Sequence, residues 1–76
     1  MRDLTDLQQQ IGERLRALRE QHHLPQATVA IFLGIHLSTY CGYEDGRRLI
    51  PTNHCVKLVR LYGVSMDYLL TLTDRR

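Results

Sequence analysis

Apolar residues recur at intervals of three and four along the first part of the chain. Their positions are Leu4, Leu7, Ile11, Leu15 and Leu18. Such spacing places them on one stripe of an α-helix, so the pattern predicts a helix over residues 5–21. Its N-terminal cap is either Thr5, in a capping box with Gln8, or Asp3.

A short second helix is predicted next. Pro25 suits the edge of a helix because it donates no backbone hydrogen bond. The inward positions after it are Val29, Ala30 and Leu33. Gly34 can adopt the left-handed conformation that ends a helix, so we expect a helix over residues 25–33 and then a sharp turn.

The apolar pattern restarts after this turn. Its buried or half-buried positions are Ile35, Tyr40 and Tyr43. Asp45 and Gly46 form a strong helix breaker, so the third helix is short and covers residues 36–44.

Two more helices complete the predicted chain. The fourth covers residues 52–62, and Gly63 terminates it. Ser65 caps a fifth helix over residues 65–72. Because no segment resembles a strand hairpin or a repeat, we expect an all-α fold, with five helices around one core in a single domain over residues 1–76.

Size and charge narrow the possible functions. A chain of 76 residues buries only about 60–65% of the surface that it exposes when unfolded, so an interior active-site cavity would be hard to build. The formal net charge of +2 permits nucleic-acid binding without requiring it. The placement of the arginines therefore matters more than their number.

Several kinds of chemistry lack their sequence signatures. Cys41 and Cys55 form no C-x-x-C motif, and the histidines do not have metal-ligand spacing. No P-loop or hydrolase motif is present. We expect a protein without catalytic activity, cofactor, metal or small-molecule ligand. No apolar run approaches the roughly 20 residues that cross a bilayer, which predicts no membrane association and a cytoplasmic protein.

Two short helices joined by a glycine turn can place the second helix in the major groove of DNA. A closer likeness is carried by the segments IGERLRALRE, LPQATVAIFLGI, STYCGYEDGRR and YGVSMDYLLTLTD. Through them, residues 11–74 resemble the Cro/cI-type, or xenobiotic-response-element, helix-turn-helix family. The resemblance implies a lambda-repressor-like, sequence-specific regulator of transcription that binds double-stranded DNA as a homodimer and acts as a repressor.

The resemblance also assigns roles to polar residues. Gln26 matches a glutamine that contacts a DNA phosphate, and Arg47 and Arg48 match basic residues on the sugar-phosphate backbone. Arg19 and Glu44 match an ion pair that sets the angle of the third helix, and Arg19 is a further candidate for a phosphate contact. The alternative interpretation is that these are solvated surface groups.

Base reading is expected from one face of the third helix. The candidates are His36, Leu37, Ser38, Thr39 and, one turn later, Gly42. Leu37 can touch a thymine methyl group, but neither Leu37 nor Gly42 can make the paired hydrogen bonds that distinguish bases most strongly. We therefore expect modest specificity.

The resemblance to phage repressors implies a dimer surface on the fifth helix, formed by Met66, Tyr68 and Leu70. Two half-sites one helical turn apart would raise both affinity and specificity.

A second function class stays open, namely a protein-interaction module with the same fold. It would use an apolar surface of Ile31, Phe32 and Leu37, although Phe32 is expected to pack into the core against Tyr40. An exposed apolar surface without converging arginines would favour this function, whereas arginines flanking the third helix would favour DNA binding.

Overall fold

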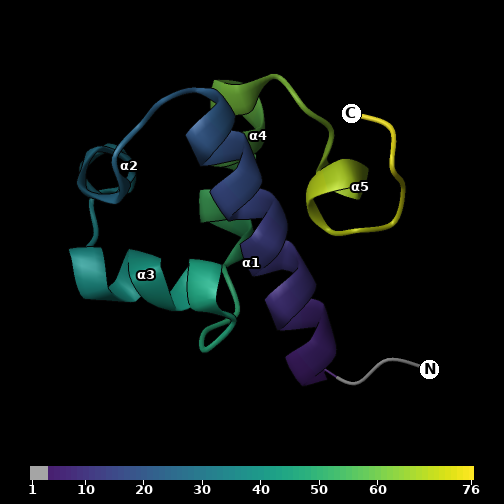
Figure 1. Cartoon of the computed structure of the whole chain (residues 1–76), viewed down its shortest axis with the longest axis horizontal. Helices are drawn as coiled ribbons and strands as arrows, with labels where there is room; N and C mark the ends of the chain where they lie inside the picture. The colour runs from purple at the N-terminus through teal and green to yellow at the C-terminus, as the bar shows by residue number, and fades with distance from the viewer. Residues whose placement is uncertain (1–3) are drawn as a thin grey trace.

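The computed structural model describes residues 4–76, which form five α-helices and no strand (Figure 1). They are α1 (Leu4–Gln21), α2 (Gln26–Leu33), α3 (Leu37–Asp45), α4 (Thr52–Tyr62) and α5 (Met66–Leu69). The predicted all-α fold is therefore confirmed. None of these helices is both long enough and apolar enough to cross a membrane.

The predicted helix starts at residues 25, 36 and 65 were each one residue early. Pro25, His36 and Ser65 have extended backbone angles and precede the first helical residue. Ser65 caps α5 as predicted, since its hydroxyl accepts a hydrogen bond from the amide of Tyr68 at 3.0 Å. The predicted capping of α1 by Asp3 or Thr5 lies outside the residues whose side chains are described.

The predicted fifth helix over residues 65–72 was too long, because α5 ends at Leu69. Thr71 adopts a positive φ of 66°, which is not helical. The cause lies in α1, where the guanidinium of Arg14 donates to the carbonyl oxygens of Tyr68 and Thr73. These contacts tie α5 and the segment after it to α1, and the chain end returns to the start of α5, where the amide of Ser65 donates to the carbonyl of Arg76 at 2.9 Å.

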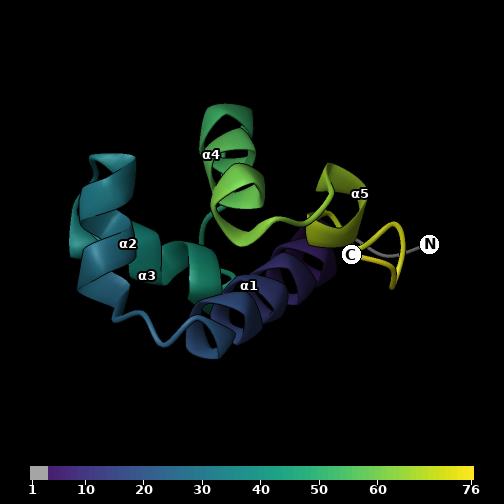
Figure 2. The same ribbon diagram turned by 90° about the horizontal axis from the view of Figure 1, so that it is seen from above.

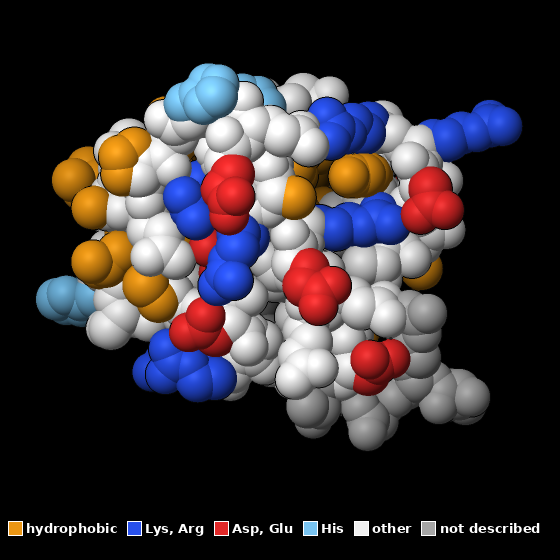
Figure 3. Space-filling view, viewed as in Figure 1, with side chains coloured by type: hydrophobic (Ala, Val, Ile, Leu, Met, Phe, Trp, Pro, Cys, Tyr) orange, Lys and Arg blue, Asp and Glu red, His pale blue; other side chains and the backbone are white. Residues whose placement is uncertain are grey.

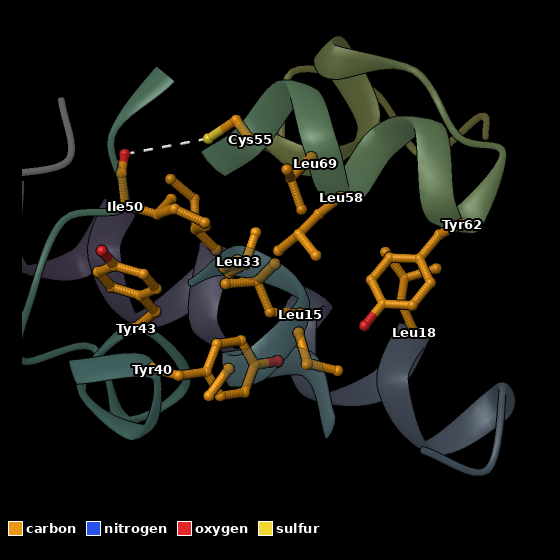
Figure 4. Packing of buried hydrophobic residues seen from close by; sticks show 13 residues of the cluster. Leu15, Leu18, Leu33, Tyr40, Tyr43, Ile50, Cys55, Leu58, Tyr62 and Leu69 are labelled. Atoms are coloured by element: carbon orange, nitrogen blue, oxygen red, sulfur yellow. Dashed lines mark hydrogen bonds between the residues drawn. The ribbon is translucent and has the colours of Figure 1, made fainter. Parts of the chain in front are cut away.

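The long helix α1 packs mainly against α3 and, to a smaller extent, against α5. Helix α3 lies against α1 and α2, while α5 lies against α4 and α1 (Figures 1 and 2). The core contains buried side chains from all five helices, including Leu15, Tyr40, Leu58 and Leu69 (Figure 4). Cys55 is a small buried member of this core, and burial raises the pKa of its thiol.

The turn between α2 and α3 depends on Gly34. Its φ of 71° is left-handed, and its amide donates to the carbonyl of Ile31 at 3.0 Å. The amide of Ile35 donates to the carbonyl of Ala30, also at 3.0 Å. These bonds satisfy the end of α2 and turn the chain so that α3 crosses α2.

Helices α1 and α3 approach each other closely at Gly12. A β-carbon at this position would lie 2.3 Å from the carbonyl oxygen of Glu44 and 2.6 Å from that of Tyr43. Both distances are shorter than van der Waals contact, and both partners are backbone atoms that cannot rotate away. A residue larger than glycine would therefore force the two helices apart.

We expect Gly12→Ala to lower the free energy of unfolding by about 3 kcal/mol, the upper end of the range for overpacking, although alanine is the better helix former. Gly63→Ala is the control, because that glycine has a φ of 69° and open space around it. It should cost only about 1–2 kcal/mol of left-handed strain. Urea unfolding measures both values, and equal losses would contradict the close approach of α1 and α3.

Candidate functional site

The first turn of α3 lies at the edge of the molecule (Figure 1), and most of its side chains are exposed to solvent. His36, Leu37 and Ser38 are exposed and Thr39 is half-buried. The opposite face of the helix is packed, because Tyr40 and Tyr43 belong to the core. An exposed helix end on a rigid base is the form that enters a major groove.

The sequence predicted that Gly42 is open for base contact, but in the structure it is covered. Gly42 is buried, and the three atoms nearest to a β-carbon built there all belong to the Arg48 side chain. The helical spacing placed position 42 correctly on the outer face. The spacing could not show that the side chain of Arg48, from the following loop, folds back over this position.

A buried carboxylate lies where α1, α2 and α3 meet. The side chain of Glu44 has 0% exposure, and the Nε atom of Arg19 donates to its Oε2 at 2.7 Å. The Oε1 atom accepts from the Gln26 amide nitrogen at 3.0 Å and from the Arg16 Nε at 3.4 Å. The hydroxyl of Tyr40 also donates to Glu44. The structure thus brings together Arg19 and Glu44, and adds three donors to the pair.

These donors control the protonation of Glu44. Burial is the largest single influence and opposes ionisation, but it is outweighed by the hydrogen bonds from Arg19, Tyr40 and Gln26 together with the positive charge of Arg19. The pKa of Glu44 is therefore lower than its ordinary value. The same ion pair raises the pKa of Arg19, mainly through its hydrogen bond with Glu44. The site holds a carboxylate and a guanidinium, both charged, at neutral pH.

Arg19 is turned inward. Its side chain is 13% exposed, and besides Glu44 it binds the carbonyl of Leu24 at 2.8 Å. Gln26 is half-buried, and its side-chain oxygen accepts from the Cys41 thiol at 3.4 Å. One of the two amide hydrogens of Gln26 serves Glu44, so the other can be donated to a ligand.

Four arginines surround the C-terminal half of α3. Arg16 and Arg19 approach Glu44, and Arg16 also binds Asp45 at 3.2 Å. Arg47 binds Asp45 at 3.1 Å, and Arg48 lies across Gly42. Figure 3 shows basic and acidic side chains mixed on this part of the surface. The roles of Arg16 at Glu44 and of Arg48 at Gly42 were not predicted, because both depend on tertiary packing.

An apolar surface adjoins this charged region. Ile31, Phe32 and Leu37 are 79%, 46% and 47% exposed, and Figure 3 shows hydrophobic side chains gathered over α2 and the adjoining end of α3. The prediction that Phe32 packs into the core was wrong. The inward face of α2 is filled by Val29, Ala30 and Leu33, which leaves Phe32 beside it.

The α5 residues predicted for dimer contact already make contacts with other residues of the same chain. Met66 and Leu70 are half-buried against the core. Two guanidinium groups lie over the Tyr68 ring, that of Arg14 at 4.3 Å and that of Arg76 at 5.5 Å from the ring centre. Only part of each of these side chains is available to a partner.

Comparisons with known proteins agree with this geometry. The family model described as "Helix-turn-helix domain" matches residues 10–71. A Bacillus subtilis (strain 168) protein named "Uncharacterized HTH-type transcriptional regulator YobD" is 47% identical over 62 residues, which cover 82% of this chain and 55% of that protein. The "SPbeta prophage-derived uncharacterized HTH-type transcriptional regulator YonR" of the same strain is 39% identical over 59 residues, or 78% and 55% of the two chains. The chain spans about half the length of these relatives, and no solved structure matches it significantly.

We expect Glu44→Gln to lower the free energy of unfolding at pH 7 by about 3–5 kcal/mol, because it leaves the buried Arg19 charge without its partner. Since the pKa of Glu44 is lowered on folding, its ionisation stabilises the fold above the unfolded-state value of about 4.3. That stabilisation is lost as the pH falls through the folded-state value. Urea unfolding at pH 7 and pH 3 should therefore show a smaller difference between wild type and variant at pH 3.

Glu13→Gln is the control, because it removes one exposed carboxylate from the same helix as Arg19. A difference between wild type and Glu44→Gln that stays constant from pH 7 to pH 3 would contradict the assigned role of the Glu44 charge.

Proposed function

Because this chain belongs to the helix-turn-helix domain family, we propose that it is a transcriptional regulator that binds double-stranded DNA. The main support is the exposed first turn of α3 with arginines gathered beside the same helix. In this arrangement α3 enters the major groove, and the basic side chains meet the phosphates at its edges.

The contacts divide into two kinds. Leu37 and Ser38, with His36 and Thr39 beside them, face the base edges. Gln26 donates its remaining amide hydrogen to a phosphate, and Arg47 adds a charge at the end of α3. Arg19 acts through Glu44, by holding α3 at its angle, rather than by touching DNA.

We propose further that the protein is a cytoplasmic repressor that occupies operator DNA as a homodimer. One domain presents few base-reading groups, and a second copy doubles them at a half-site one turn of DNA away, about 10 base pairs. The exposed parts of Met66, Tyr68 and Leu70 supply the contact between copies. Selected operator sites should then contain two inverted copies of one short sequence.

The exposed apolar surface of Ile31, Phe32 and Leu37 favours a second candidate function, in which the fold serves as a protein-interaction module. A partner protein could bury this surface whether or not DNA is bound. DNA binding would weaken as salt rises and would depend on the arginines beside α3, because it rests on contacts with phosphates. Binding through the apolar surface would depend on neither.

We expect the wild-type protein to bind a pool of random-sequence DNA duplexes, and the affinity to fall steeply as salt rises. Arg47→Ala should weaken binding to all sequences and reduce the slope of log affinity against log salt by about 1, the value for one lost phosphate contact. Gln26→Ala should weaken binding with a smaller change in this slope, because its amide is uncharged. Fluorescence anisotropy at several salt concentrations measures each quantity.

Arg60→Ala is the matched control, because Arg60 is an exposed arginine on α4, away from α3. It should bind as wild type does. Absence of binding at low salt, with the protein folded, would refute the DNA-binding proposal and favour the interaction module.

A further inference from the structure

The Arg48 side chain lies across the outer face of α3. Its Cδ, Cγ and Nε atoms are 3.0, 3.1 and 3.4 Å from the place where a β-carbon at position 42 would be. The backbone holds it there, because the chain turns at Gly46 and the amide of Arg48 donates to the carbonyl of Gly42 at 3.1 Å. Arg48 therefore occupies the space that a side chain at position 42 would fill.

The guanidinium of Arg48 differs from those of the arginines around it, because no described residue forms a hydrogen bond or ion pair with it, although its charge acts on Tyr43. Arg14, Arg16, Arg19 and Arg47 each bind a carboxylate within 3.4 Å. Within residues 4–76, the Arg48 guanidinium makes no ion pair or hydrogen bond. No described residue takes up any of its five N–H donors, so these donors can bind a ligand.

The position of Gly42 determines which surface this guanidinium serves. Gly42 follows the exposed Ser38 by four residues, so the two lie one above the other on the same face of α3. This is the face that the proposed complex turns toward the base edges. The exposed residues at the start of α3 include the apolar Leu37 and the short hydroxyl side chain of Ser38. Neither makes the paired hydrogen bonds with which arginine can reach a guanine.

We propose that Arg48 is a specificity-determining residue that reads a guanine in the major groove from its position across Gly42. The inference rests on the proposed DNA binding and adds to it a base reader supplied by the loop after α3. Gly42 is the positioning residue, because its missing side chain leaves the path that Arg48 takes. This role differs from the phosphate contact that the sequence predicted for Arg48.

The test is selection of bound duplexes from a random pool, followed by sequencing, with wild type, Arg48→Ala and Gly42→Ala. Wild type should prefer guanine at one position of each half-site by about 5- to 150-fold, the range for one paired contact. Arg48→Ala should lose this preference and keep the preferences at other positions.

Gly42→Ala should weaken the same preference, because its β-carbon displaces the Arg48 side chain. Its thermal midpoint should stay unchanged or rise, since alanine favours a helix more than glycine does. The double variant should lose no more of the preference than Arg48→Ala alone, which shows that the two residues act together. Arg47→Ala is the matched control and should weaken binding to every sequence without changing any base preference.

Three results would overturn the inference. If Arg48→Ala keeps every base preference and lowers only the salt slope, Arg48 is a phosphate contact and DNA binding itself still stands. If Gly42→Ala keeps the guanine preference while Arg48→Ala loses it, Gly42 does not position the reader. If folded wild-type protein binds no duplex, the proposed function is wrong and the inference falls with it.

Discussion

The buried carboxylate of Glu44 is the constraint on which the arrangement of α1, α2 and α3 depends. An ionised group without solvent is costly unless donors surround it. Here the donors come from three helices, through Arg19, Tyr40 and Gln26. Any rotation of α3 against α1 or α2 would break at least one of these bonds and leave charge unpaired. A buried pair of this kind contributes little net stability, so its main effect is to define one orientation of α3.

Apolar contacts alone would define that orientation less well. Leucine and valine side chains pack in several similar ways, and helices that share only such contacts can slide or rotate at small cost. The backbone approach at Gly12 and the hydrogen bonds of Glu44 act on the same two helices from neighbouring points. Together they restrict both the distance and the rotation of α3 relative to α1. The exposed residues of α3 are thereby held in fixed positions before any ligand arrives.

Much of this fold could be predicted from the sequence, because helical periodicity and glycine turns are local signals. The helix-turn-helix family, suggested by segments such as LPQATVAIFLGI, is confirmed by the family match. The errors arose where a distant side chain intervenes. Arg14 shortens α5 by binding the carbonyl of Tyr68, and Arg48 covers Gly42. Phe32 was misplaced because three smaller residues already fill the inward face of α2. The contacts of Arg14 and Arg48 leave no trace in the spacing of residues along the chain, whereas the inward face of α2 did follow from that spacing and should have excluded Phe32 from the core.

Asp45 binds both Arg16 and Arg47 in the free protein. A duplex that takes up these guanidinium groups must first displace the carboxylate, so part of the attraction to phosphate is cancelled by contacts already present. In the proposed complex, these ion pairs therefore weaken the attraction to any duplex, whatever its sequence. A regulator that binds unrelated DNA more weakly dissociates from it sooner. It therefore samples more of the genome in a given time before it reaches its operator.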